Sequence, residues 1–295
     1  AEHNGRSMID GQIENIDKVA ALAGQVKETL AKQLGKELTR VHIAAAGRAL
    51  RTQKATYEID LPEVQLITED IISRLEAGAI SAAEENFCRE SGVEDVKPRF
   101  YLAGYTISQY YLDDYLMSSL SDHHGKNIRA DIIATFLPGE VVESLYAAMN
   151  KIDLEVASVT LEPIAAINAV IPEELRLLNL ALADIGAGTS DIAACRDGSV
   201  IGYTMATIAG DEITEAVMKE YLVDFQTAEK IKMQIEEQKD VTFLDVLGFQ
   251  QTIPYDEVMQ CIGEVSQTLC LEIAEKIKEV NGGTPSAIFL SGGGS

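Results

Sequence analysis

The chain has 295 residues, of which 46% are hydrophobic and 24% charged, and its formal net charge is −23. A chain of this length and composition folds as one large or two medium globular domains. The negative charge disfavours binding to nucleic acid or to anionic lipid, because both need clustered Lys and Arg. It allows a nucleotide site, where local glycines and Mg²⁺ matter more than overall charge. No apolar run reaches the roughly 18 residues of a membrane-spanning helix.

The first part of the chain predicts an amphipathic helix and a strand. Apolar side chains recur at helical spacing over residues 13–34, and an apolar strand begins at residue 41. Residues 48–136 then form what we expect to be a compact α+β insertion, with a helix over 67–91 and strands over 54–61, 98–115 and 128–137.

Five of the ten tyrosines fall between Tyr101 and Tyr115. A set of aromatic residues at this density is typical of a packed sheet face rather than a ligand platform. His123 and His124 lie in a loop-like segment, where we expect surface histidines because no third metal ligand is evident. The four cysteines form no CxxC pair and predict reduced, mostly buried thiols of a cytoplasmic protein; they are Cys88, Cys195, Cys261 and Cys270.

From residue 138 onward the pattern alternates helices and strands. A helix that starts at Pro163 and a long helix over 255–283, closed by Gly282, are the clearest predictions. The strand over 286–291 is predicted to be buried and to run into glycines. The other expected elements are a helix over 138–152, a strand over 154–163, a meander of hairpins over 177–208 and two helical pieces within 210–237.

The stretch "LADIGAGTSDIAAC", residues 182–195, combines a carboxylate with a glycine turn between two strands. Gly186 and Gly188 allow the backbone to approach an anion and to point N–H groups into the turn, where Thr189 adds a hydroxyl donor. Asp184 would repel a phosphate directly but can hold hydrated Mg²⁺ beside it. The alternative is a tight β-hairpin in which glycine only supplies positive φ. The second glycine cluster, Gly292 to Gly294, also follows a strand.

Three motifs resemble the superfamily of actin, DnaK-type chaperones and sugar kinases. "ALADIGAGTSDIAAC" is similar to its second phosphate motif, "LEPIAAINAV" to its first connecting helix, and "AIFLSGGGS" to its adenosine motif. Within the superfamily the match is best to FtsA-like proteins, because "NGRSMIDGQIENIDKVA" and "VHIAAAGRALRTQ" resemble the segments that lead into the FtsA insertion. The pilus protein PilM shares this plan.

The resemblance implies an α/β fold of the actin-like (ribonuclease-H-like) type, with two lobes, ATP between them and an SHS2-type insertion called 1C. We expect the chain to be truncated at both ends, without the first phosphate motif and without a C-terminal amphipathic membrane helix. The implied subdomains are 1A at 1–47 and 137–173, 1C at 48–136, 2A at 174–210 and 281–295, and 2B at 211–280.

The same resemblance implies roles for individual residues. Asp184 would place Mg²⁺ through water, and Glu162 would orient or polarise the attacking water. The remaining nucleotide-binding residues would be Gly186, Gly188 and Thr189 at the phosphates, Gly210 and Asp211 at a helix start beside the nucleotide, Glu229 and Lys232 at the ribose and base, and Gly292, Gly293 and Gly294 under the adenine.

Several of these residues also have ordinary structural interpretations. Glu229 and Lys232 are spaced like a surface i,i+3 pair. Asp211 could be an N-cap, and Glu162 could cap the helix of Pro163. Asp191, just past the turn, could bond the backbone rather than a ligand.

The first functional hypothesis is an ATP-binding actin-like protein of bacterial cell division, FtsA-like, whose nucleotide controls self-assembly and partner binding. Its implied partners are further copies of itself and a tubulin-like protein of the FtsZ type. It would be cytoplasmic and peripheral at the inner face of the membrane, and at most a slow Mg²⁺-dependent ATPase. The alternatives are a DnaK-type chaperone-like ATPase, a PilM-like pilus assembly protein, a sugar kinase and a scaffold that no longer binds nucleotide.

Overall fold

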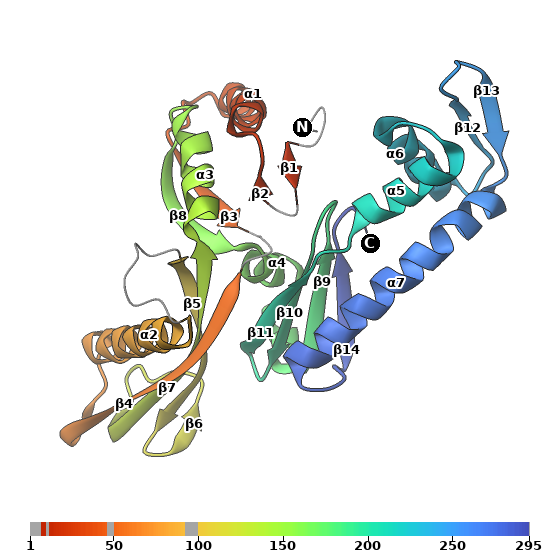
Figure 1. Cartoon of the computed structure of the whole chain (residues 1–295). Coiled ribbons are helices and arrows are strands. Elements are labelled where there is room, and N and C mark those ends of the chain that lie inside the picture. The colour runs from red at the N-terminus through yellow and green to blue at the C-terminus, as the bar shows by residue number, and fades with distance from the viewer. Residues whose placement is uncertain (1–6, 10–11, 46–49, 92–99, 295) are drawn as a thin grey trace.

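The computed structural model describes residues 7–9, 12–45, 50–91 and 100–294. The chain forms two α/β lobes that lie side by side, with an insertion below the first lobe and a small outer unit beyond the second (Figure 1). The elements of the first lobe are β1 (Met8–Ile9), β2 (Gln12–Ile13), α1 (Ile16–Leu34), β3 (Arg40–Ala45), α3 (Gly139–Asn150) and β8 (Glu155–Leu161).

Helix α1 forms where the spacing of its apolar residues predicts it. The Asn15 side chain accepts a hydrogen bond from the Lys18 N–H at its start, and Gly35 ends it with a φ of 63°. The apolar face is only partly covered by α3, since Ala20 is buried but Leu30 is exposed. Strands β3 and β8 pair in parallel.

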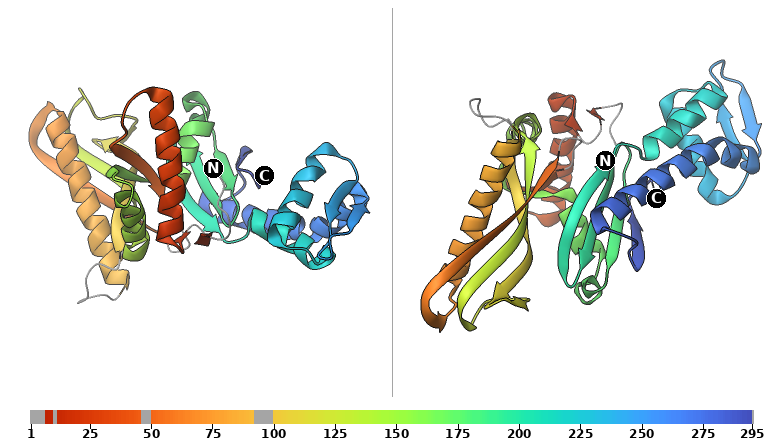
Figure 2. Two further views of the ribbon diagram at one scale, coloured as in Figure 1. Left: turned by 90° about the horizontal axis from the view of Figure 1, so that it is seen from above. Right: turned by 60° about the horizontal axis from the view of Figure 1, so that its bottom comes forward.

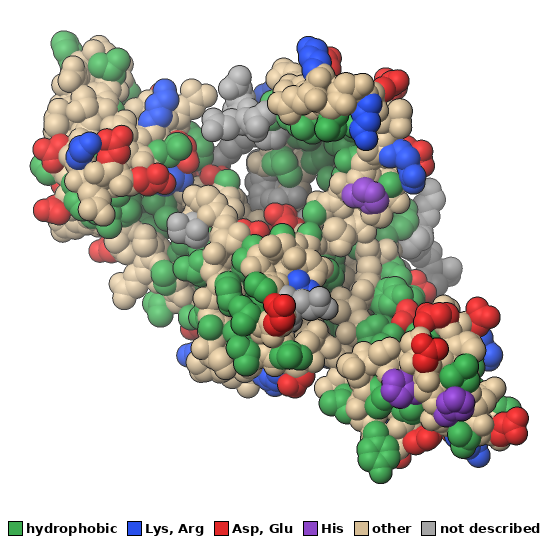
Figure 3. All heavy atoms as spheres, turned by 180° about the vertical axis from the view of Figure 1, so that it is seen from behind, with side chains coloured by type: hydrophobic (Ala, Val, Ile, Leu, Met, Phe, Trp, Pro, Cys, Tyr) green, Lys and Arg blue, Asp and Glu red, His purple; other side chains and the backbone are tan. Residues whose placement is uncertain are grey.

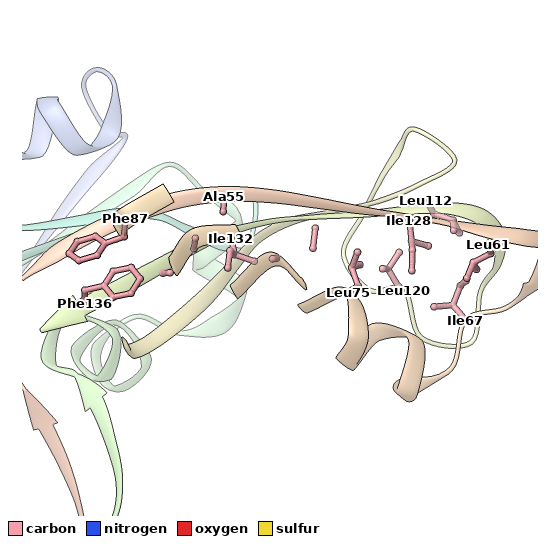
Figure 4. Close-up of a cluster of buried hydrophobic side chains, with 14 residues drawn as sticks. Ala55, Leu61, Ile67, Leu75, Phe87, Leu112, Leu120, Ile128, Ile132 and Phe136 are labelled. Carbon is pink, nitrogen blue, oxygen red and sulfur yellow. The ribbon is translucent and has the colours of Figure 1, made fainter. Parts of the chain in front are cut away.

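The insertion is an antiparallel sheet with one helix on its face. The strand order is β4-β7-β5-β6, and α2 packs on β4 and β7. Its core is apolar, with Phe87 stacked on Phe136 at 4.1 Å and Leu75 fully buried (Figure 4). The elements are β4 (Arg51–Leu66), α2 (Glu69–Ser91), β5 (Phe100–Leu112), β6 (Tyr115–Met117) and β7 (His124–Pro138). The predicted boundary at 47/48 lies outside the described residues.

Two predictions for the insertion are wrong. The strand expected over 98–115 ends at Leu112, because Asp113 and Asp114 have φ values of 47° and 68° and form a two-residue turn into β6. The tyrosines do not form one packed face, since three of the five are exposed. The hydroxyls of Tyr105 and Tyr110 instead donate hydrogen bonds to Glu76, and that bond, with burial, raises the pKa of Tyr105 to about 12.

The second lobe is a four-stranded sheet of order β11-β10-β9-β14, with β14 parallel to β9. Asp197 and Gly198 have φ values of 53° and 81°, and they turn β10 into β11. Helix α7 packs along β10 and β11. The elements are α4 (Glu162–Val170), η1 (Glu173–Leu177), β9 (Leu180–Ile185), β10 (Ser190–Arg196), β11 (Ser199–Ala206), α7 (Tyr255–Asn281) and β14 (Ala287–Ser291).

Strand β14 exists, but the prediction that it is buried is wrong. It is the edge strand of the sheet, and α7 packs chiefly on β10 and β11. Ile288 and Leu290 therefore remain 48% and 62% exposed. Seen from behind, hydrophobic side chains are visible over the middle of the molecule, where this sheet lies, and acidic and basic side chains are interspersed elsewhere (Figure 3).

A shared core joins the insertion sheet to the second lobe. Ile133 and Leu137 of β7 pack in one buried cluster with Leu182 of β9 and Tyr203 of β11. Within this cluster the hydroxyls of Thr135 and Tyr203 form a hydrogen bond. The contact therefore crosses from the insertion sheet to the sheet of the second lobe.

The outer unit stands apart from both sheets at one end of the molecule, in both views of Figure 2. It contains α5 (Gly210–Tyr221), α6 (Phe225–Gln234), η2 (Ile235–Glu237), β12 (Val241–Leu244) and β13 (Gln250–Ile253). The β12–β13 hairpin has no counterpart in the sequence predictions. Its turn is organised by the Asp245 carboxylate, which accepts from the N–H groups of Leu247 and Phe249 at 2.9 Å.

The cysteine prediction needs correction. Cys195 is buried, but Cys88 and Cys270 are exposed and Cys261 is intermediate. Over the described ranges, no helix combines the length and apolar character needed to cross a membrane.

Candidate functional site

The site is built around the hairpin between β9 and β10. Asp184 and Asp191 lie directly opposite each other in the antiparallel register. The N–H of Gly186 donates to the carbonyl of Thr189 at 2.9 Å and closes the turn. The hairpin therefore exists as expected, and what distinguishes it from an ordinary hairpin is the contact that two other segments make with its turn.

The first of these segments is the start of α5. The N–H of Gly210 donates to the carbonyl of Gly186 at 3.0 Å, and the N–H of Asp211 donates to the carbonyl of Ala187 at 2.7 Å. Both groups are among the N–H groups that a helix leaves unpaired at its start. The prediction that these N–H groups meet a ligand therefore needs correction, because they hold the turn.

The N-cap interpretation of Asp211 is also wrong. Helix α5 begins at Gly210, so Asp211 lies in its first turn and Ala209 takes the N-cap position. The N–H of Ala209 donates to the Glu212 carboxylate at 2.8 Å. Glu212 therefore caps this helix, a role that the sequence analysis missed although a Glu three residues after an N-cap is its usual signal.

The second segment is the glycine run after β14. Ser291 pairs with Asp184, and the N–H of Gly294 donates to the carbonyl of Ile185 at 2.9 Å. Gly292 has a φ of 93°, and a Cβ there would lie 2.2 Å from the Ile185 carbonyl oxygen. A Cβ on Gly294 would lie 2.7 Å from the Gly186 carbonyl oxygen. Only glycine fits at these two positions.

The remaining glycines differ in how much space a Cβ would have. A Cβ on Gly210 would lie 3.1 Å from the Gly186 carbonyl oxygen and 3.6 Å from the Cα of Gly294. Gly293 has open space around it, and Gly188 lies half-buried in the turn. Two glycine-bearing segments, the α5 start and the 292–294 run, thus converge on the backbone of Ile185 and Gly186.

Three carboxylates, those of Glu162, Asp184 and Asp191, influence one another beside the hairpin. Asp191 is 5% exposed and accepts a hydrogen bond from the Thr189 hydroxyl at 3.4 Å. Burial, followed by the negative charge of Glu162, raises the pKa of Asp191 to about 7. Burial and the charge of Asp184 also raise the pKa of Glu162. Glu162 and Asp184 each make ionisation of Asp191 less favourable, and Asp184 does the same for Glu162.

These carboxylates do not form a ready-made direct metal site. Among the residues that the structure describes, no three His, Cys, Asp or Glu side chains lie close enough together to hold a metal ion. Glu162 begins α4, where no side-chain cap hydrogen bond forms, so it contributes to that helix start through its charge alone. For Asp191, the observed partner is the Thr189 side chain rather than the backbone.

Glu229 and Lys232 lie on α6, beside the start of α5. Their carboxylate and ammonium groups are 2.7 Å apart, and the Lys232 side chain is only 18% exposed. Lys232 also donates to the Gly210 carbonyl at 3.2 Å and to the Thr214 hydroxyl at 2.8 Å. The interpretation as an ordinary surface pair is therefore wrong. Thr214 was missed, although its position on the inner face of a predicted helix was an available signal.

The hairpin turn, the start of α5, α6 and the 292–294 run are neighbours through the contacts above, and α4 packs on β9 and β10 of the same hairpin. A hollow of about 370 Å³ lies further along α5. It is lined by Glu215, Met218, Lys219 and Phe225 and does not reach the glycine cluster.

Comparison of sequences finds FtsA. The chain is 22% identical over 239 residues to cell division protein FtsA of Bacillus subtilis, covering 73% of this chain and 54% of that protein. It is 22% identical over 233 residues to FtsA of Pseudomonas aeruginosa, covering 78% and 52%. The chain is similar to FtsA. It spans about half the length of these curated relatives. No family model matches it.

Comparison of structures gives the fold. A chain of the PilM-PilN type IV pilus biogenesis complex superimposes with a TM-score of 0.66 at 17% identity, covering 100% of this chain and 73% of that one. The ethanolamine utilization protein EutJ of Carboxydothermus hydrogenoformans gives 0.51 at 15% identity, covering 98% and 65%. The FtsA-like chain has the actin-like fold, as its motifs predicted.

Proposed function

We propose that this protein binds Mg²⁺-ATP beside the glycine cluster and uses the nucleotide to control its own assembly. The single observation that carries the proposal is the contact that two glycine segments, at Gly210 and at 292–294, make with the glycine turn at Ile185 and Gly186. Side chains are excluded there by backbone carbonyls, so the turn, the helix start and the glycine run pack against one another through their main chains. The same three segments are the ones that the motif resemblance assigns to phosphate, helix start and adenine.

The phosphates would lie at the turn of residues 186–189. The N–H groups of Gly188 and Thr189 and the Thr189 hydroxyl are the donors that we assign to them. The nearby carboxylates of Glu162, Asp184 and Asp191 would repel a triphosphate, so the site needs a cation. The donor set fits hydrated Mg²⁺, which keeps several waters and takes few protein carboxylates. Asp184 would hold that ion through water.

Glu162 is the residue we assign to the attacking water. Its raised pKa comes from burial first, and a carboxylate shifted in this way is suited to proton transfer. It would orient and polarise the water, with hydrolysis slow at most. When bound, Mg²⁺ would neutralise charge on the phosphates. Glu229 and Lys232 would meet the ribose and base, and the 292–294 run would lie under the adenine.

For the whole protein, we propose a role in bacterial cell division, as the relatives are named cell division protein FtsA. Its partners would be further copies of the chain and a tubulin-like division protein of the FtsZ type, met through residues 211–280. Exposed apolar residues in that range support an interface, and they include Leu244, Val246, Leu247 and Phe249. The insertion would contact the next subunit, and the protein would be cytoplasmic and peripheral at the inner membrane face.

A second candidate function follows from the likeness to PilM. The superposition with the PilM-PilN complex covers the whole of this chain, so a partner of the pilus assembly machinery is the alternative to a division protein. A chaperone-like ATPase is the third candidate, and it differs in predicting steady ATP turnover without assembly.

The test is calorimetry of ATP binding with Mg²⁺, on wild type and Asp184→Asn, with sedimentation in the presence and absence of ATP. Asp256→Asn is the matched control. Asp256 is exposed in the first turn of α7, and its substitution changes shape and charge in the same way as Asp184→Asn. We expect wild type and the control to bind ATP, Asp184→Asn to bind at least tenfold more weakly (about 1.4 kcal/mol), and ATP to drive large assemblies. Failure of wild type to bind ATP would overturn the proposal.

A further inference from the structure

We propose that Thr214 is a positioning residue for nucleotide recognition, and that it fixes the Glu229 and Lys232 side chains for the ribose of the bound nucleotide. The inference rests on the proposed function, because it concerns the same site. Neither the motif resemblance nor the comparisons assign a role to Thr214.

Thr214 lies at the centre of a polar network between α5 and α6. It is fully buried on α5, one turn after Gly210, and shares its helix face with Val217. A buried hydroxyl needs hydrogen-bond partners, since leaving one unpaired costs on the order of 1–3 kcal/mol. Thr214 has three: Gly210, Glu229 and Lys232.

The geometry gives each partner a distinct role. The Thr214 hydroxyl accepts from the Lys232 ammonium at 2.8 Å. Its single proton can go to the Glu229 carboxylate at 2.5 Å or to the Gly210 carbonyl at 3.1 Å. The carboxylate is the stronger acceptor because it is charged. The hydroxyl thus orients both members of the ion pair at once.

Without Thr214 the pair would keep its charge attraction but lose its orientation. Lys232 and Glu229 are 2.7 Å apart on one helix, and the Glu229 side chain is 37% exposed. A carboxylate with this exposure has several rotamers available. If one rotamer is already fixed in the free protein, less side-chain entropy is lost when the nucleotide binds. A bond from Thr214 is what keeps Glu229 directed toward the start of α5.

The start of α5 is where this orientation matters. Lys232 also donates to the Gly210 carbonyl at 3.2 Å, and the Gly210 N–H donates to the Gly186 carbonyl of the phosphate turn at 3.0 Å. The Glu229–Lys232 pair is therefore held beside the glycine cluster rather than facing bulk water. A ribose beside this cluster would present its 2′- and 3′-hydroxyls to the Glu229 carboxylate, a good acceptor for hydroxyl donors.

The experiment measures binding of Mg²⁺-ATP, Mg²⁺-2′-deoxy-ATP and Mg²⁺-tripolyphosphate to the full-length protein by calorimetry. Thr214→Val removes the hydroxyl and keeps the shape, and Thr214→Ser restores a hydroxyl. Thr268→Val is the matched control: the Thr268 hydroxyl also bonds the carbonyl four residues before it, that of Glu264 at 2.9 Å, but on an exposed face of α7. Thermal unfolding verifies that each variant is folded.

We expect wild type, Thr214→Ser and Thr268→Val to bind ATP several-fold more tightly than 2′-deoxy-ATP. In Thr214→Val we expect ATP affinity to fall about tenfold and the preference for ATP over 2′-deoxy-ATP to disappear, with tripolyphosphate binding unchanged. A folded Thr214→Val that keeps the wild-type preference would overturn the inference alone, and so would a Thr214→Ser that behaves like the valine variant. Absence of ATP binding by wild type would overturn the proposed function and this inference together.

Discussion

The N–H of Gly210 donates a hydrogen bond of 3.0 Å to the carbonyl of Gly186 in the hairpin turn. A Cβ on Gly210 would come within 3.1 Å of that same oxygen, so the two backbones lie in direct contact. The turn that we assign to the phosphates is thus continuous with the helix that leads into the outer unit. A ligand that shifts the turn would also act on α5, which is the physical basis for a nucleotide-controlled switch.

Replacement of Gly292 tests the fit of the glycine run. In Gly292→Ala the Cβ would lie 2.2 Å from the Ile185 carbonyl oxygen, at a φ of 93°. We expect a lower free energy of unfolding by about 1–3 kcal/mol and at least tenfold weaker ATP binding. Urea unfolding and calorimetry measure the two effects.

Gly263→Ala is the control for this substitution. Gly263 lies within α7 and has open space around its Cα, so alanine should leave ATP binding intact and raise stability by up to about 1 kcal/mol through helix propensity. If the two alanine variants have the same stability and the same ATP affinity, the close approach of the 292–294 run to the Ile185 carbonyl is incorrect.

The raised pKa of Asp191 predicts an unusual pH dependence of the free energy of unfolding. Burial raises its pKa to about 7 in the folded protein from the model-peptide value of 3.8, so between these values the folded state binds the extra proton. Its contribution to stability is therefore present below about pH 4 and is lost as pH rises toward 7. Each unit of pKa difference corresponds to about 1.4 kcal/mol.

Asp191→Asn removes this dependence, because the amide stays neutral and can still accept from Thr189. We expect the variant to be more stable than wild type above pH 7, with the difference shrinking toward pH 4. Urea unfolding across this range measures it, and Asp256→Asn serves as the exposed control. A variant less stable than wild type at pH 8 would show that the Asp191 charge is compensated in the folded protein.

The bond between Thr135 and Tyr203 predicts coupling between the insertion sheet and the second lobe. Both residues are buried, at 0% and 4% exposure, and the bond links β7 to β11. Tyr203→Phe should lower the free energy of unfolding by about 1–3 kcal/mol because the Thr135 hydroxyl loses its partner. Adding Thr135→Val should recover part of this loss in a double-mutant cycle. Strictly additive effects would show that the two hydroxyls do not interact.

Glu162→Gln separates hydrolysis from binding. The amide keeps the shape of the side chain but cannot act as a base. We expect Mg²⁺-ATP affinity to stay within a few-fold of wild type, or to increase because one negative charge is removed, while any ATP hydrolysis falls at least tenfold. Single-turnover assays with radiolabelled ATP measure the rate. An unchanged rate of ATP hydrolysis in Glu162→Gln would show that Glu162 does not act on the attacking water.

The sequence predicted the parts of the molecule that local chemistry determines. The αL cap at Gly282 and the Asp197-Gly198 turn each need a backbone conformation that few residues adopt, so their residue types reveal them. The long helix over 255–283 was equally clear from its repeating apolar face. The actin-like fold was predicted from a resemblance, carried by the order of the three motifs at 161–170, 181–195 and 287–295.

The parts that depend on distant segments could not be predicted. The exposure of β14 depends on where α7 packs, and the use of the Gly210 and Asp211 N–H groups depends on the position of the hairpin turn. The β12–β13 hairpin is too short for a periodic signal, since each strand has four residues. Thr214 became visible only when its hydroxyl was found between Glu229 and Lys232.

The most direct test of the central claim is hydrogen–deuterium exchange of the full-length protein with and without Mg²⁺-ATP. It locates the ligand without relying on a substitution. We predict that protection increases at residues 184–189, at the start of α5 and at 290–294, with little change in the insertion sheet. Binding of ATP with no added protection in any of these three segments would contradict the nucleotide site proposed for the glycine cluster.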